Sequence, residues 1–180
     1  FSPYKHIPMA KISGDIEQQT VTCLSTSKTF NLAGLFTSQI IIQNEEYRKA
    51  YSGEMEKLHL SPNIFGMVAS EAAYLHGDAW LDELLDYLWG NYLLVKEFIN
   101  ERLPRIGLTV PEATYLLWLN FRDYGLSEKQ LNSLLTVKAG VGMNMGSMFG
   151  PGGRGFQRMN IACPRSVVLS ALERLGVALG

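Results

Sequence analysis

The feature that most constrains the fold is a run of apolar residues at helical spacing between Asp78 and Arg102. The apolar positions of this run are Trp80, Leu81, Leu84, Leu85, Leu88, Tyr92, Val95 and Phe98. This periodicity predicts one long helix whose apolar face packs in a core. Asp78 is a favourable N-cap residue, and Pro104 cannot continue a helix, so both ends of the segment are marked. We therefore predict a domain boundary at the start of this helix, with residues 1–77 before it and the helix opening the second part, residues 78–180.

Residues 1–77 are expected to contain two strands and two helices. The runs Thr20–Leu24 and Thr37–Gln43 are rich in β-branched and apolar residues, which is typical of strands buried in a larger sheet. Two helical segments follow at 44–58 and 62–76. The second follows Ser61, and Pro62 suits the first turn of a helix. This part of the chain therefore reads as part of a large α/β domain.

Residues 104–180 are expected to form a smaller α+β domain, in which helices cover a small sheet. We predict strands near Thr109 and at 114–121, 141–145 and 156–162, and helices at 127–138 and from Arg165 onwards. Ser127 and Gln130 have the spacing of a capping box, which marks a helix start. The glycine-rich segment 146–155 is interpreted as a mobile loop at the mouth of a cleft or as a simple connection.

Composition excludes several classes of function. The 180 residues are 47% hydrophobic and carry a formal net charge of -1, so the chain can bury a core but has no basic surface for nucleic acid. No apolar run approaches the roughly 20 residues of a membrane-spanning helix, so we expect no membrane partner. Cys23 and Cys163 lack the spacing of a redox pair or zinc site, and the histidines are scattered. We expect reduced thiols, no metal and a cytoplasmic location.

The segment from Ser25 to Asn31 places Lys28 directly after the first predicted strand, among hydroxyl side chains. Burial disfavours the charged form of a lysine, and an uncharged amine can attack a carbonyl. The alternative is a surface lysine whose amine only meets solvent. Ser25 is likewise open to two interpretations. Its hydroxyl can bind a ligand group, but a serine before a turn often satisfies backbone groups only.

Three ordered motifs carry a resemblance to a known family. They are Ser25–Leu35, Glu112–Leu119 and Gly153–Arg165. With them the chain resembles the class I/II aminotransferase superfamily of pyridoxal-phosphate (PLP) enzymes, and within it the MalY/PatB subgroup of cystathionine β-lyases. The resemblance implies fold type I of the PLP-dependent transferases in truncated form. Part of the large-domain sheet (1–77) would carry the PLP lysine, followed by an interdomain helix and the α+β small domain (78–180).

The same resemblance implies roles for individual residues. Lys28 would hold PLP covalently and act as the base, while Ser25 and Ser27 would bind the cofactor phosphate. Arg158 would receive the substrate carboxylate, because a guanidinium can bond both carboxylate oxygens at once. Tyr115 would line the substrate cleft or only pack. Two further positions have weaker implications: Asn31 would fix the turn, and Phe36 stands where many aminotransferases carry a phosphate-binding arginine.

The implied reaction is β-elimination from cystathionine or a cysteine S-conjugate, giving a thiol, ammonia and pyruvate. An aminotransferase is the alternative, and a regulatory binding protein on the same fold is a further one. The family implies a homodimer, with a small amino acid as substrate. It also implies that this chain is the C-terminal half of a subunit and lacks the aspartate, glycine-rich loop and aromatic residue that complete the cofactor site. We therefore expect the chain alone to be inactive.

Overall fold

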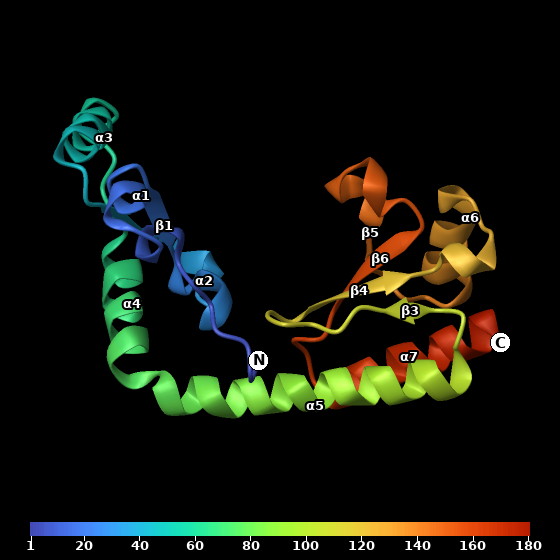
Figure 1. The fold of residues 1–180 in the computed structure, drawn as a ribbon. Helices are drawn as coiled ribbons and strands as arrows, with labels where there is room; N and C mark the ends of the chain where they lie inside the picture. The colour runs from blue at the N-terminus through green and yellow to red at the C-terminus, as the bar shows by residue number, and fades with distance from the viewer. The chain divides into compact units, whose positions relative to one another are not determined.

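The computed structural model describes residues 1–180, whose contacts form two units (Figure 1). The N-terminal unit comprises residues 5–84, and the C-terminal unit comprises residues 1–4 and 85–180. The long helix α5 (Asp78–Arg102) has the predicted bounds and contributes residues to both units. Asp78 was predicted to be its N-cap but is its first helical residue, because the carbonyl of Gly77 accepts the first helical bond, from Leu81 at 2.9 Å. A functional domain boundary at residue 77 stays a prediction.

The N-terminal unit contains a two-stranded antiparallel sheet and several helices. Strands β1 (Val21–Leu24) and β2 (Gln39–Ile42) pair so that Val21 lies opposite Ile42. The helices are α1 (Gly14–Gln18), α2 (Thr26–Thr29), α3 (Glu45–Lys57) and α4 (Ile64–His76), with 3-10 turns at Met9–Lys11 and Ala33–Leu35. Both strands occur where they were predicted, but the expectation of burial is wrong for β1. Val21 is 48% exposed and Leu24 is 44% exposed, because no further strand joins these two in their sheet.

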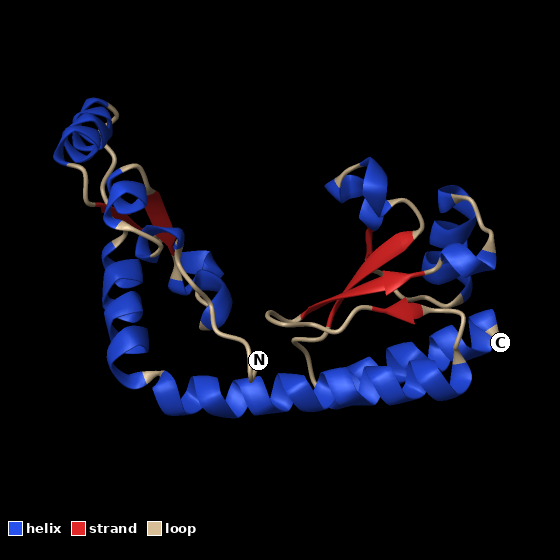
Figure 2. Cartoon of the chain, viewed as in Figure 1, coloured by secondary structure: helices blue, strands red, loops and turns tan.

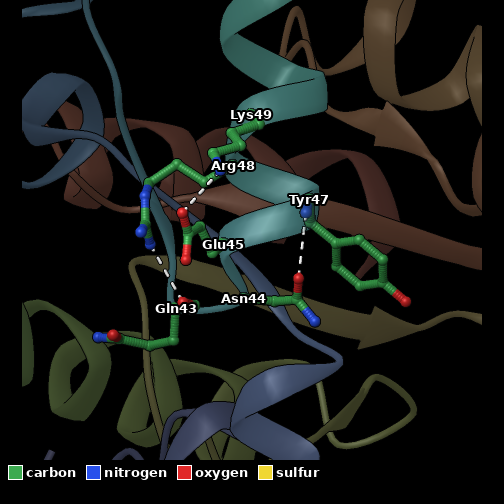
Figure 3. A network of polar contacts seen from close by, with 6 residues as sticks. All are labelled: Gln43, Asn44, Glu45, Tyr47, Arg48 and Lys49. Atoms are coloured by element: carbon green, nitrogen blue, oxygen red, sulfur yellow. Dashed lines mark hydrogen bonds and ion pairs between the residues drawn. The ribbon is translucent and has the colours of Figure 1, made fainter.

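The start of α3 is fixed by side chains that satisfy backbone groups. The Asn44 side chain accepts a hydrogen bond of 3.1 Å from the backbone N–H of Tyr47, as an N-cap residue does (Figure 3). The side chain of Arg48, a residue of α3, donates hydrogen bonds to the carbonyls of Ile42 (2.7 Å) and Gln43 (3.1 Å). These bonds tie the first turn of α3 to the end of β2.

The start of α4 differs from the prediction. The helix begins at Ile64 with Asn63 as its N-cap, and the Asn63 side chain accepts a bond of 3.0 Å from the N–H of Phe65. Pro62 therefore precedes the helix instead of lying in its first turn. The physical reason is that the asparagine oxygen satisfies a free N–H group, which proline cannot do.

The C-terminal unit is built on a four-stranded antiparallel sheet in the order β3-β4-β6-β5 (Figure 2). The strands are β3 (Gly107–Leu108), β4 (Leu116–Asn120), β5 (Asn144–Met145) and β6 (Phe156–Asn160). They are shorter than the predicted runs but lie within or next to them. In the centre of the sheet Trp118 of β4 lies opposite Arg158 of β6, and Asn144 of β5 lies opposite Arg158 on the other side.

Helices complete this unit and form its core with the sheet. They are the end of α5, α6 (Glu128–Ser133), a π-helical turn (Leu134–Lys138) and α7 (Arg165–Leu179), with 3-10 turns at Arg122–Tyr124, Gly146–Phe149 and Pro151–Gly153. The capping box predicted at Ser127 and Gln130 is confirmed. Buried residues of the core include Val95, Leu119, Ile161 and Leu172, all at 0% exposure. The α+β arrangement predicted for this part is therefore present.

Candidate functional site

Lys28 lies in α2, the single helical turn that directly follows β1. The side chain is exposed, and its amine makes no hydrogen bond or ion pair within the chain. Burial of Lys28 was one of the two possibilities left open by the sequence, and in the structure this lysine is not buried. What the structure does provide is an unengaged primary amine at the end of a strand.

The two serines beside Lys28 differ in what their hydroxyl groups bind. The Ser25 hydroxyl accepts a bond of 3.1 Å from the N–H of Ser27 and donates one of 2.8 Å to the carbonyl of Thr37. Since a serine has one O–H, that proton is already engaged. The Ser27 hydroxyl has no partner in the chain and remains available to an acceptor. Phosphate binding by either serine stays a prediction.

The turn that carries Lys28 is held by α4. The hydroxyl groups of Thr26 and Ser70 lie 2.9 Å apart, and these residues are only 2% and 4% exposed. A Cβ atom at Gly66 would lie 1.7 Å from Oγ1 of Thr37, so only glycine permits this close approach. This pair was not predicted from the sequence, because 44 residues separate the two hydroxyls and Ser70 stands in no motif.

Asn31 and Phe36 shape the chain after the lysine. Both have positive φ angles, 55° for Asn31 and 47° for Phe36. Asparagine tolerates this left-handed conformation better than most residues, which fits a role in fixing the turn. The Phe36 side chain is 91% exposed and carries no charge, so this position supplies no cation to a phosphate.

Arg158 lies on β6, and the C-terminal unit holds its guanidinium in place. Its Nη2 donates a bond of 2.9 Å to Oδ1 of Asn144. Its Cζ lies 4.5 Å from the centre of the Phe149 ring, which is a cation–π contact. The Nε atom is buried without a hydrogen-bond partner. Sequence reasoning singled out neither Asn144 nor Phe149, although strand pairing makes Asn144 a neighbour of Arg158.

The glycine-rich segment after β5 is tied to itself and to the sheet. A Cβ atom at Gly146 would lie 2.1 Å from the carbonyl oxygen of Gly153, so the two backbones approach as only glycine allows. Arg122 donates to the carbonyls of Arg154 (3.0 Å) and Gly152 (2.8 Å). Of the two interpretations considered from the sequence, the contacts favour a connection that is held in place.

Tyr115 and Arg165, which stand in two of the sequence motifs, are used for packing. Tyr115 is half-buried against the core, and its hydroxyl has no partner in the chain. Arg165 donates from Nε to Asn91 at 3.1 Å and covers the ring of Tyr87 at 4.9 Å. Arg158 thus differs from Arg165 in lying on the predicted strand, whereas Arg165 begins helix α7 and donates from its Nε to Asn91. A substrate role for Arg158 or Tyr115 stays a prediction.

The predicted site residues do not all belong to one unit. Lys28, Ser25 and Ser27 lie in the N-terminal unit, whereas Arg158 and Tyr115 lie in the C-terminal unit. No group of three or more histidine, cysteine or acidic side chains could hold a metal ion. No helix is long and apolar enough to cross a membrane.

The chain is similar to known PLP enzymes and C–S lyases. It is 40% identical to cystathionine β-lyase PatB of Bacillus subtilis over 177 residues, and 34% identical to the protein MalY of Escherichia coli over 164 residues. These matches cover 98% and 89% of this chain. Among solved structures, cystalysin from Treponema denticola, which contains PLP, matches with a TM-score of 0.94 and 34% identity over 98% of this chain. This match shows the fold of a PLP-dependent enzyme of fold type I, as predicted.

The matches are confined to part of each relative. The chain covers 46% of PatB, 41% of MalY and 45% of the cystalysin chain. It therefore spans less than half the length of these relatives and corresponds to their C-terminal half. No family model matches the chain.

Proposed function

Because this chain is homologous to the C-terminal half of the MalY/PatB cystathionine β-lyases, we propose that it supplies that half of a PLP-dependent carbon–sulfur β-lyase. The observation that carries the proposal is the free amine of Lys28, directly after a strand, in a chain 40% identical to PatB. The holoenzyme is the PLP-loaded protein that contains this chain together with a segment corresponding to the N-terminal half of its relatives.

The donor groups on the lysine turn fit the cofactor. PLP carries an aldehyde, which needs a free amine, and a phosphate, which needs hydrogen-bond donors. Lys28 has the unengaged amine, and Ser27 has the unengaged hydroxyl on the adjacent residue. Ser25 could donate to the phosphate only after releasing the carbonyl of Thr37. The donor set is therefore adequate for PLP, with Ser27 better placed than Ser25 to donate.

The chain's own residues then have distinct tasks. When bound, PLP supplies an electron sink for the charge left by proton removal at the substrate α-carbon. Lys28 would hold the cofactor through its amine and, whenever that amine is free, would act as the base that takes the α-proton. Arg158 binds the α-carboxylate through its outer N–H groups. Loss of a β-thiolate, which takes up a proton to become the thiol, completes the elimination. The released enamine tautomerises to an imine, and water hydrolyses that imine to ammonia and pyruvate.

The proposal extends to the substrate class and the assembly. The substrate is a small amino acid with a sulfur leaving group, such as cystathionine, and the working protein is a cytoplasmic homodimer. Neither nucleic acid nor a membrane is a partner. The absence of a cation at Phe36 favours the lyase over an aspartate-type aminotransferase, because the phosphate clamp implied for the latter is missing.

Covalent labelling of Lys28 tests the proposal. The holoenzyme is reduced with borohydride, and the phosphopyridoxyl group is mapped by mass spectrometry. We expect the label on Lys28 and none on Lys49, an exposed lysine paired with Glu45 at 2.8 Å. A Lys28→Ala variant should lose the label. An unlabelled Lys28 in a folded, PLP-treated protein would contradict the proposal and favour a regulatory binding protein.

A second assay separates the two enzymatic readings. Pyruvate release from cystathionine is compared with amine transfer that depends on an added keto acid. We expect pyruvate without any keto acid. Turnover only in the presence of the keto acid would assign the protein as an aminotransferase while leaving Lys28 as the cofactor lysine.

A further inference from the structure

Arg158 has one side-chain hydrogen-bond partner in the structure. Asn144 and Arg158 are directly opposed residues of the paired strands β5 and β6, and Oδ1 of Asn144 accepts a bond of 2.9 Å from Nη2. The amide oxygen accepts this hydrogen bond but carries no charge, so it does not neutralise the guanidinium. The positive charge of Arg158 therefore stays available while one of its arms is fixed.

The flat face of the same guanidinium is also fixed. Its Cζ lies 4.5 Å from the centre of the Phe149 ring, and Phe149 packs edge-on against Trp118 with ring centroids 5.8 Å apart. Trp118 is itself opposite Arg158 across the β4–β6 pair. The ring restrains the tilt of the guanidinium, and Asn144 restrains its rotation in the plane.

These contacts decide which donors face outward. The Nε atom is buried, and Nη2 donates one hydrogen bond to Asn144, whereas Nη1 has no hydrogen-bond partner in the chain. A carboxylate that approaches the outer edge can meet Nη1 and the second proton of Nη2 together, the paired geometry that arginine and carboxylate prefer. With Nη2 bonded to Asn144, Nη1 and the remaining Nη2 proton are the donors left for such a bond.

We propose that Asn144 is a positioning residue that orients the Arg158 guanidinium for a ligand carboxylate. The inference rests on the proposed function, because it takes Arg158 as the carboxylate-binding residue. An arginine that is already oriented loses less conformational freedom when the ligand binds. Asn144 is exposed, so its replacement leaves the core of the C-terminal unit intact.

The test measures ligand binding and turnover separately in the holoenzyme. The probe is 3-(methylthio)propanoate, a carboxylate with a thioether but no amine, so it binds without reacting with the cofactor. Its Kd is measured by calorimetry for the wild type and for Asn144→Ala, Asn144→Asp and Arg158→Ala. The matched control is Asn160→Ala, since Asn160 lies on the same strand as Arg158 and bonds only the N–H of Ala162.

We expect Asn144→Ala to raise Kd about tenfold, the cost of ordering one long side chain plus a lost hydrogen bond. Its kcat for cystathionine should stay within about twofold while KM rises in step with Kd, because carboxylate binding is common to ground and transition states. Asn144→Asp should weaken binding more, since its carboxylate competes for the guanidinium. Asn160→Ala should leave Kd unchanged.

Double substitution distinguishes positioning from a general structural effect. In an Arg158→Ala background, Asn144→Ala should add no further loss, because it acts only through Arg158. An unchanged Kd in Asn144→Ala, with a large loss in Arg158→Ala, overturns the inference and leaves the proposed function standing. An unchanged Kd in Arg158→Ala overturns the carboxylate role on which the inference depends.

Discussion

At the scale of single residues, Lys28 and Arg158 are treated in opposite ways by the structure. Lys28 is exposed and bonds nothing, whereas Arg158 is bonded by Asn144 and covered by Phe149. The proposed chemistry explains the difference. A lysine that alternates between holding a cofactor and moving a proton must be free to swing, but a carboxylate receptor works best when its geometry is set in advance.

The two cysteines provide a prediction about reactivity. Burial raises the pKa of the Cys163 thiol, and Cys163 lines an open cavity of about 410 Å³ between α7 and the sheet, whereas Cys23 is exposed. A raised pKa leaves less thiolate at a given pH, and the thiolate is the nucleophile. We expect iodoacetamide at pH 8 to alkylate Cys163 about fivefold more slowly than Cys23. The difference between the alkylation rates of the two cysteines should become smaller as the pH rises.

Peptide mapping by mass spectrometry measures both alkylation rates in one sample of the native chain. The control is the chain in urea, where burial is removed and the two thiols should react at similar rates. Equal rates in the native chain would show that Cys163 is not shielded as the structure describes.

At the scale of elements, the close approach of α4 to the segment that precedes β2 can be tested by substitution. A Cβ atom at Gly66 would lie 1.7 Å from Oγ1 and 2.7 Å from Cβ of Thr37, and rotation of the threonine side chain cannot move its Cβ away. We expect Gly66→Ala to destabilise the chain by about 1–3 kcal/mol, the usual cost of overpacking. Urea unfolding followed by circular dichroism measures the change.

Gly53→Ala is the matched control. Gly53 lies inside α3, and a Cβ atom there would meet nothing within 4 Å. Alanine in an open helical position should stabilise by about 0.5–1 kcal/mol. Similar effects at Gly53 and Gly66 would mean that α4 does not pack against Thr37, in the segment that precedes β2.

Elements with local signals were predictable from the sequence. The bounds of α5, the capping box at Ser127 and the start of α7 at Arg165 all follow from periodicity, capping chemistry or proline placement. The start of α4 was missed by two residues, because Asn63 and Pro62 are both start signals and only the structure shows which one bonds the helix. A helix end can be predicted when neighbouring residues give one clear start or stop signal. When two start signals compete, as Pro62 and Asn63 do, the sequence does not show which one the helix uses.

The residues that support the candidate site could not be predicted in the same way. Lys28 and Arg158 stand in sequence motifs, but their supports come from distant positions. Thr26 meets Ser70 across 44 residues, and Asn144 meets Arg158 through strand register. The burial of β1 was mispredicted for a related reason, since an apolar strand shows that it can be buried but not what covers it.

At the scale of the whole chain, burial is distributed very unequally. The hydrophobic core lies entirely in the C-terminal unit, whereas Ile42 is the only buried hydrophobic side chain of the N-terminal unit. Apolar side chains of α4 face solvent instead, among them Ile64 at 68%, Phe65 at 74% and Leu75 at 67% exposure. Burial of apolar surface is the main source of stability, so the N-terminal unit should be the weaker of the two.

Hydrogen exchange of the 180-residue chain alone tests this expectation. Amides of the β1–β2 pair should exchange about tenfold faster or more than those of the β4–β6 pair, because local opening requires less free energy where little apolar surface is buried. The same preparation should release no pyruvate from cystathionine, since the proposed function requires the segment that corresponds to the N-terminal half of the relatives. Adding the N-terminal segment of the holoenzyme should slow exchange in β1–β2 and restore turnover together. Equal protection of the two sheets, or robust turnover by the chain alone, would show that the N-terminal unit is stable and competent without further burial.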